Sequence, residues 1–416
     1  MVKAHITMPK EHINNLYSWL LNFQIFNDQY KRRYDASKQY DENDIFIFFD
    51  PTWRHPDYPD GLAFFDTKHN CAAILGMSYF GEIKKGTLTL AWATAARNNY
   101  VSCHGGLKIF RKEGDSYVAS FFGLSGSGKS TLTHAKHDDK YDIEVLHDDA
   151  FVISVEDGSS VALEPSYFDK TNDYPAGHRE QDYFVTVQNC GVTLDENGRK
   201  VLVTEDIRNG NGRTIKSRYS TPNRVDKIQE PIQSIFWIMK DDALPPLVKI
   251  TDPRLASILG CTLMTKRSTA ENTGAGANLD ALVIEPYANP FRVYPLVEDY
   301  EKFKALFDKG VDCYIINTGD FLGKKVTKEV SLGVIETVVD GKANFELFGG
   351  LPGMEYLPVE GYEVPDMNGE YAELIRDRMQ FRLDYLKAFN DANPEHQIPQ
   401  DALESIKTIE RFIDVL

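Results

Sequence analysis

Tyr117-Val-Ala-Ser-Phe-Phe-Gly-Leu-Ser-Gly-Ser-Gly-Lys-Ser-Thr-Leu132 is the stretch of sequence that decides the fold. Its first six residues are mostly apolar and predict a buried strand, while 130–137 are compatible with a helix. Between them stand the four residues of the spacing G-x-x-x-x-G-K-[ST]: Gly123, Gly128, Lys129 and Ser130. Backbone N–H groups of such a turn can surround a polyphosphate at the start of the following helix. The sequence therefore predicts a nucleotide phosphate site.

The residues of this loop have separate tasks in phosphate binding. Lys129 is placed to reach the β- and γ-phosphates, and the hydroxyl of Ser130 is placed to bind the Mg²⁺ of the nucleotide. A glycine loop formed by chance is the alternative, but the flanking strand and helix favour the phosphate site. We expect the nucleotide to contact Gly123, Leu124, Ser125, Gly126, Ser127, Gly128, Lys129, Ser130 and Thr131.

The composition is that of a folded globular protein. The chain has 416 residues, of which 42% are hydrophobic and 12% aromatic, enough for a large core and two domains or subdomains. The net charge is −16, and lysines and arginines form no block. This balance argues against a nucleic acid partner.

The cysteines and the apolar runs indicate the compartment. Five cysteines are widely scattered with no CxxC pair, which favours reduced thiols in a cytoplasm over disulfides or a zinc site. The N-terminus lacks an apolar signal core, and no apolar run reaches 18 residues. We expect a cytoplasmic protein without a membrane segment.

The pattern along the chain mixes helices with short strands. Residues 31–43 are polar and predict a loop or a frayed connector, and 195–198 predict the turn of a hairpin within 185–203. Helical spacing occurs in 9–24, 300–308, 371–386 and 403–413. Strand-like runs are 45–49, 62–65, 72–77, 143–146, 151–154, 235–239 and 311–316. The chain is therefore predicted to be α/β.

Two segments before the loop carry candidate functional side chains. Lys84 and Lys85 are adjacent, which is typical of a solvated turn, but the apolar run and Gly81 before them allow at least one to point inward. A lysine buried near a metal can lose its proton and become a ligand or an acid–base group. His104 stands before two glycines that permit close approach of another group, although a lone histidine is more often a hydrogen-bonded core or loop residue.

Two segments after the loop complete the set of candidates. Asp148 and Asp149 follow the strand 143–146, where a carboxylate beside a phosphate loop usually holds Mg²⁺ or its water; an acidic turn is the alternative. Arg218 belongs to a group with Arg213 and Arg224. An arginine there could stabilise charge on a transferring phosphoryl group, while a basic turn is more often exposed to solvent.

Taken in this order, the motifs resemble those of the ATP-dependent phosphoenolpyruvate carboxykinases. The family's Tyr-Gly-Gly-Glu-Met-Lys-Lys-Gly is similar to residues 79–86, and its Gly-Leu-Ser-Gly-Thr-Gly-Lys-Thr is similar to residues 123–130. Its Met-His-Cys-Ser, Gly-Asp-Asp-Glu and Thr-Arg-Val-Ser-Tyr-Pro segments resemble residues 103–105, 147–150 and 217–222. Its Val-Asn-Thr-Gly and Gly-Lys-Arg-Ile-Ser look like 316–319 and 323–327.

The resemblance implies a role for each matched residue. The ligands of Mn²⁺ would be Lys85, as a neutral amine, His104 and Asp149. Ser130 and Asp148 would serve the Mg²⁺ of ATP. The organic substrate and the moving phosphoryl group would face Tyr79, Lys84, Ser125 and Arg218, and the catalytic residues would be Lys84, Lys85, Lys129 and Arg218. Oxaloacetate would lose CO₂, and the resulting enolate would attack the γ-phosphate of ATP.

The chain also departs from the family pattern. Only 78 residues precede Tyr79, and they lack the family's Arg-Ser-Pro-Lys-Asp-Lys segment, whose arginine clamps a substrate carboxylate. The adenine-side Thr-Glu-Arg-Gly-Ile-Thr-Glu-Pro run is not reproduced either. Binding without a bidentate clamp would sacrifice orientation and affinity. A kinase on the same scaffold, which phosphorylates a hydroxyl of another metabolite or protein, therefore remains the alternative.

The resemblance implies a phosphoenolpyruvate carboxykinase-like P-loop fold with mixed sheets. Residues 1–100 would form a reduced N-terminal subdomain on the substrate side. Residues 101–416 would form the larger domain that binds nucleotide and metal and carries the C-terminal helices. The expected partners are ATP and a small-molecule acceptor, with no nucleic acid or membrane, and the expected assembly is a monomer or a small homo-oligomer.

Overall fold

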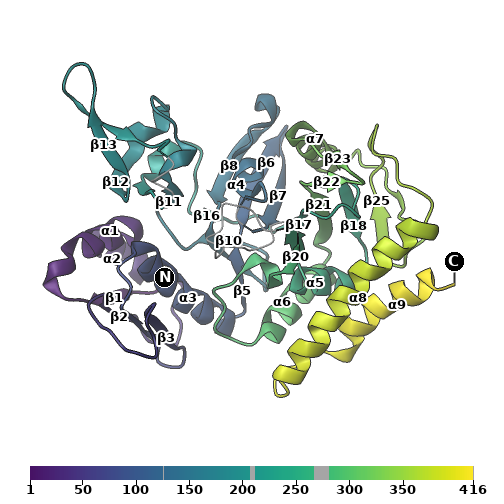
Figure 1. Cartoon of the computed structure of the whole chain (residues 1–416), viewed down its shortest axis with the longest axis horizontal. Helices are drawn as coiled ribbons and strands as arrows, with labels where there is room; N and C mark the ends of the chain where they lie inside the picture. Colours follow the sequence, from purple (N-terminus) through teal and green to yellow (C-terminus); the bar gives the residue numbers. More distant parts are fainter. Residues whose placement is uncertain (125, 207–210, 267–280, 416) are drawn as a thin grey trace. The chain divides into compact units, whose positions relative to one another are not determined.

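The structure is a computed structural model that describes residues 1–124, 126–206, 211–266 and 281–415. It is a mixed α/β fold with several sheets, as predicted (Figure 1). The chain forms two compact units, each built from two segments: Met1–Thr94 with Ala162–Asp226, and Ala95–Val161 with Lys227–Leu416. The first unit thus also takes in a later segment, whereas the predicted division at residue 100 treated the N-terminal part as continuous.

The first unit has a four-stranded sheet in the order β1-β2-β4-β3. The strands are β1 (Ala4–Thr7), β2 (Ile45–Asp50), β3 (Leu62–Asp66) and β4 (Cys71–Leu75), and only β3 runs antiparallel to its neighbour. Side chains of β2 alternate between buried and exposed, as a half-buried strand requires. The buried ones pack with residues of α1 (Ile13–Phe23) and α3 (Phe80–Arg97).

The later segment adds smaller elements to this unit. A three-stranded antiparallel sheet has the order β11-β15-β12, with β11 at Tyr167–Lys170, β15 at Arg213–Lys216 and β12 at Phe184–Gln188. The predicted hairpin is formed by β13 (Gly191–Leu194) and β14 (Lys200–Val203). Its short 3₁₀ helices are η3 (Thr171–Asp173), η4 (Arg179–Tyr183) and η6 (Arg218–Ser220), and the N-terminal segment contains η1 (Lys10–His12).

The second unit is built on an eight-stranded sheet in the order β24-β25-β18-β21-β17-β7-β6-β8. Its strands are β6 (Gly106–Lys112), β7 (Asp115–Phe122), β8 (Asp142–His147), β17 (Ser234–Met239), β18 (Leu247–Ile250), β21 (Asp312–Asn317), β24 (Glu346–Leu347) and β25 (Met354–Tyr356). Large apolar side chains of β7, β17 and β21 form its core together with residues of α7 (Lys328–Val339).

The remaining strands of this unit form three smaller sheets. One has the order β16-β10-β9-β5, and the others pair β19 with β20 and β22 with β23. Their bounds are β5 (Tyr100–His104), β9 (Ala150–Ser154), β10 (Ser160–Ala162), β16 (Lys227–Ile228), β19 (Met264–Lys266), β20 (Leu282–Ile284), β22 (Asp320–Phe321) and β23 (Lys324–Lys325).

The second unit contains the C-terminal helices and the helix that follows the phosphate loop. Its helices are α4 (Lys129–His134), α5 (Pro253–Cys261), α6 (Leu296–Asp308), α7, α8 (Gly369–Ala392) and α9 (Gln400–Ile413), with 3₁₀ turns η2 (His137–Asp139) and η7 (Pro286–Ala288). The C-terminal α8 and α9 pack side by side (Figure 1).

Strand direction in the large sheet decides where its loops meet. β17 runs parallel to both β7 and β21, and β8 has the same direction as β7 because each pairs antiparallel with β6. The carboxyl ends of β7, β8, β17 and β21 therefore lie at one edge of the sheet. In open α/β sheets, ligands bind at such an edge.

Most predicted elements are present, and one interpretation was wrong. Residues 31–43 are not a loop throughout, because α2 spans Asp28–Asp35, where the Asn27 side chain accepts from Gln29 and Tyr30 and caps the helix. For the adjacent lysines, the alternative of a solvated turn does not hold. They belong to α3, which starts at Phe80 and includes Gly81.

Candidate active site

The phosphate loop joins β7 to α4 at the carboxyl edge of the large sheet. Gly126 and Gly128 adopt positive φ angles of 76° and 99°, which only glycine takes without strain. Gly123 is closely packed, since a Cβ there would lie 2.4 Å from Ser127 Oγ and 2.9 Å from Ile238 Cβ. Lys129 is half-buried, whereas Ser130 and Thr131 are exposed at the start of α4. Ser125, a predicted contact of nucleotide and substrate, lies outside the described residues.

Two side chains that the sequence analysis did not select hold this loop. Lys240, directly after β17, donates from Nζ to the carbonyl of Gly126 at 2.7 Å. Thr318, directly after β21, donates from Oγ1 to the carbonyl of Ser127 at 2.7 Å. Both strands were predicted, so their parallel pairing with β7 was the signal that could have placed these residues beside the loop.

His104 and Asp149 come together at the ends of β5 and β8. His104 Nε2 lies 3.0 Å from Asp149 Oδ1. The backbone brings them together as well, because Gly105 N–H donates to the carbonyl of Asp149 at 3.0 Å. His104 Nδ1 lies 2.5 Å from the carbonyl of Ala288, which can only accept, so this nitrogen carries the hydrogen.

Asp148 points to a different histidine. Its Oδ2 lies 3.2 Å from Nε2 of His134, the last residue of α4. Burial opposes the charge on this carboxyl, but the contact with His134 outweighs burial and holds the pKa of Asp148 well below its usual range. The neighbouring His147 is buried and accepts through Nδ1 from the backbone N–H groups of Asp149 and Ala150. Both aspartates are thus fixed in place.

Lys84 is a buried residue of α3 in the first unit. Its Nζ lies 3.1 Å from Glu164 Oε2, and both side chains are almost fully buried. Asn22 also donates to Glu164, at 2.7 Å from Nδ2 to Oε1. Of the two alternatives for the adjacent lysines, the inward orientation holds for Lys84.

The other candidates of the first unit lie on separate elements. Lys85 is half-buried on α3, with Nζ 5.8 Å from the centre of the Trp92 ring. Burial raises the pKa of Tyr79, while Arg213 acts in the opposite direction. Arg218 Nη1 lies 2.8 Å from Asp226 Oδ1; burial opposes its charge, but this ion pair outweighs burial and raises the pKa of Arg218. Lys85 belongs to a different unit from His104 and Asp149, so their convergence stays a prediction.

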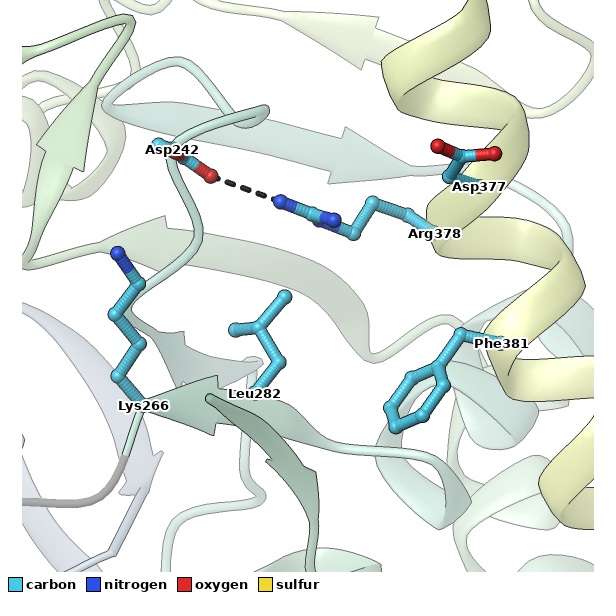
Figure 2. Close-up of a pocket in the computed structure, with 6 residues that line it drawn as sticks. All are labelled: Asp242, Lys266, Leu282, Asp377, Arg378 and Phe381. Atoms are coloured by element: carbon cyan, nitrogen blue, oxygen red, sulfur yellow. Dashed lines mark hydrogen bonds and ion pairs between the residues drawn. The ribbon is translucent and has the colours of Figure 1, made fainter. Parts of the chain in front are cut away.

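A cavity of about 440 Å³ lies in the second unit. Figure 2 shows Phe381 and Arg378 projecting from α8, with Arg378 reaching Asp242 at 2.9 Å. The rest of its lining is Asp377, Lys266 and Leu282. A smaller cavity shares Asp242 and Lys266 with it and is also lined by Lys240, which contacts the loop.

Comparison with known proteins adds a finding to this geometry. A family model described as phosphoenolpyruvate carboxykinase, of the ATP-dependent type, matches residues 30–366. The chain belongs to the ATP-dependent phosphoenolpyruvate carboxykinase family. It is also 24% identical over 363 residues to phosphoenolpyruvate carboxykinase (ATP) of Aeropyrum pernix, covering 78% of this chain and 70% of that protein.

Membership of this carboxykinase family implies the use of ATP and a divalent metal ion. Within the described ranges, no three histidine, cysteine, aspartate or glutamate side chains are grouped closely enough to hold a metal by themselves. The carboxykinase motifs pair one imidazole with one carboxylate, and the further predicted ligands are Lys85, Ser130 and Asp148. The described helices include none with the length and apolar character of a membrane span.

Proposed function

We propose that this chain catalyses the ATP-dependent decarboxylation of oxaloacetate to phosphoenolpyruvate, ADP and CO₂. The observation that carries the proposal is the arrangement in the second unit. The phosphate loop follows β7, and the His104–Asp149 pair stands at the ends of β5 and β8. The family match covers both motifs. Phosphoryl transfer to an enolate needs a phosphate cradle and a cation, and these two features would supply them.

The donor set of the pair fits a metal ion. Since His104 Nδ1 carries the hydrogen toward Ala288, Nε2 of the neutral ring presents a lone pair toward the Asp149 carboxylate 3.0 Å away. Two lone pairs at this distance repel each other, so either a proton or a cation belongs between them. A carbonyl that fixes the histidine tautomer is typical of metal-binding histidines. We assign His104, Asp149 and Lys85 to Mn²⁺, and Ser130 and Asp148 to the Mg²⁺ of ATP.

The chain's own residues would divide the work of the reaction. Loss of CO₂ breaks a carbon–carbon bond of oxaloacetate and leaves an enolate. Its oxygen attacks the γ-phosphorus, and the bond to the ADP oxygen breaks. Lys129 would hold the β- and γ-phosphates, the cations would supply electrostatic stabilisation of the enolate and phosphoryl group, and Tyr79, Lys84 and Arg218 would orient the substrate. Arg218 would have to exchange its Asp226 partner for substrate, and the buried Lys84 would have to exchange Glu164.

The cavity of Figure 2 would hold the nucleoside part of ATP. Phe381 provides an aromatic face and Leu282 an apolar one, while Lys266 and Asp377 provide polar groups. This combination suits a purine and its ribose, because bases stack on aromatic rings and their edges need hydrogen-bond partners. The second unit, Ala95–Val161 with Lys227–Leu416, would accordingly bind the nucleotide.

The test is a direct assay of the purified chain. ATP, Mg²⁺, Mn²⁺ and oxaloacetate should yield phosphoenolpyruvate. Lys129→Ala should abolish the reaction, whereas Lys136→Ala, an exposed lysine beyond α4, should leave it within about twofold of the unaltered chain. Lys85→Ala should chiefly remove activation by Mn²⁺. Absence of phosphoenolpyruvate in the presence of bound ATP would contradict the proposal.

A kinase for another acceptor is the second candidate. The engagement of Arg218 by Asp226 favours it, because an arginine held by a carboxylate of the chain is less free to bind a dicarboxylate. ATP consumption that rises with a hydroxyl-bearing acceptor, and not with oxaloacetate, would select it. For either reaction we propose a cytoplasmic monomer or small homo-oligomer, consistent with five free cysteines.

A further inference from the structure

Lys108 is a lysine in the interior of the second unit, outside the motifs discussed so far. It lies on β6, next to the strand of the phosphate loop, and its side chain is fully buried. Its Nζ lies 2.7 Å from the carbonyl oxygen of Leu132 and 3.1 Å from that of Ala135. Leu132 belongs to α4 and Ala135 follows its last residue. Lys108 therefore binds the end of the helix that starts at Lys129.

A histidine and a glutamate complete this contact. Lys108 Nζ lies 2.9 Å from His137 Nε2, and His137 Nδ1 lies 2.9 Å from Glu336 Oε1 on α7. The Glu336 carboxylate accepts, so His137 carries its hydrogen on Nδ1 and presents the lone pair of Nε2 to Lys108. The ammonium group has three donors, and Leu132, Ala135 and His137 accept all three.

The contact matters because α4 is short. It has only six residues, so its last turn lies one turn away from Lys129 and Ser130. The last carbonyls of a helix have no partner within the helix, and a buried carbonyl left unpaired is costly. Gly106, on the same strand, allows Thr133 of α4 to approach closely. A Cβ at position 106 would lie 1.9 Å from Thr133 Oγ1. β6 thus determines where α4 sits.

We propose that Lys108 is a positioning residue for phosphoryl transfer, which holds α4 against β6 and so fixes the Lys129 and Ser130 side chains at the phosphates. The proposal rests on the proposed function, because it assumes that the loop binds ATP. Lys108 itself touches no substrate. Its action runs through the two carbonyls at the end of α4 and through the orientation that Glu336 imposes on His137.

The first test replaces the ammonium group by an isosteric apolar chain. In Lys108→Met, the dissociation constant of Mg·ATP, measured by calorimetry on the folded chain, should rise about tenfold or more, since small displacements of positioned groups are costly. The KM for ATP should rise with it, while the KM for the acceptor changes little. Lys112→Met is the matched control on the same strand, because Lys112 is exposed and its amino group pairs with Asp340. Its dissociation constant for Mg·ATP should stay within about twofold of the unaltered chain.

A second variant guards against a failure of Lys108→Met to fold. Glu336→Gln keeps size, and its side chain is partly exposed. The amide of the new glutamine can donate to His137 Nδ1. The hydrogen of the His137 ring would then lie on Nε2, where it would point at the Lys108 amino group and remove an acceptor from it. ATP affinity should fall in this variant too. Folded variants that bind Mg·ATP as tightly as the unaltered chain would overturn the proposal, whereas an unaltered chain that binds no Mg·ATP would overturn the proposed function.

Discussion

Single residues in the second unit show how little space surrounds the phosphate loop. A Cβ at Gly106 would lie 1.9 Å from Thr133 Oγ1, and a Cβ at Gly105 would lie 2.9 Å from the Phe121 carbonyl. Neither glycine has a positive φ angle, so their role is close approach and not a special backbone conformation. The strand before the loop and the helix after it are therefore closely packed on these glycines, and a single methyl group can disturb the packing.

Gly106→Ala tests this packing. The added methyl group must push Thr133 away, so we expect a loss of about 1–3 kcal/mol in the free energy of unfolding and weaker ATP binding. Gly333→Ala is the matched control, because Gly333 lies within α7 and a Cβ there meets nothing within 4 Å. It should stabilise the chain by up to about 1 kcal/mol. Urea unfolding gives the free energy of unfolding of both variants. The same change in the two variants would contradict the close approach at Gly106.

Asp299 is a buried carboxyl whose titration should be visible in stability. It lies on α6, and the Tyr294 hydroxyl contacts its oxygens at 3.0 and 3.2 Å. Burial raises the pKa of Asp299 to about 6. The folded chain then binds more protons than the unfolded chain between about pH 4 and 6, so stability falls as pH rises through this window.

Asp299→Asn should remove that dependence. Relative to the variant, the unaltered chain should lose stability on the order of 2 kcal/mol between pH 4 and pH 7. Denaturant unfolding at several pH values gives the difference between the two proteins. Parallel pH profiles would show that Asp299 titrates near its usual pKa in the folded chain.

At the scale of elements, α3 shows what the sequence could and could not predict. The strand–loop–helix at 117–134 was predictable because strand, loop and helix signals follow one another locally. α3 contains Gly81 and Gly86, which read as a turn next to adjacent lysines. The reason for glycine at position 86 is a tertiary contact, since a Cβ there would lie 2.5 Å from Ile74 Cδ1 of β4. The same holds for Lys240 and Thr318, which only the pairing of β7, β17 and β21 brings to the loop.

The Lys84–Glu164 ion pair ties α3 to the segment before β11, within the first unit. Lys84→Met would leave a buried carboxylate without this cation and should cost about 3–5 kcal/mol of unfolding free energy. Adding Glu164→Gln removes the charge and should recover part of that loss. Lys31→Met, which breaks the exposed Lys31–Asp35 pair of α2, should cost no more than about 0.5 kcal/mol. A Lys84→Met loss as small as this would place Lys84 outside the core.

At the scale of the whole molecule, neither unit is a continuous stretch of chain. The chain passes from one unit to the other after Thr94, Val161 and Asp226. α3 and β10 continue across two of these positions. A boundary within an element leaves no linker signal of glycine, proline or polar residues, which is why sequence composition could not locate it.

Hydrogen exchange with and without Mg·ATP can separate the two units. All proposed nucleotide contacts lie in the second unit, so a ligand at 100 times its dissociation constant should stabilise that unit by about 2.7 kcal/mol. Slower exchange should appear in β7, α4 and β8, with the strands β1 to β4 of the first unit unchanged. Lys129→Ala should abolish the effect because the phosphates lose their cation. Equal protection of both units would show instead that they open together, so that the division into units does not describe how the chain unfolds.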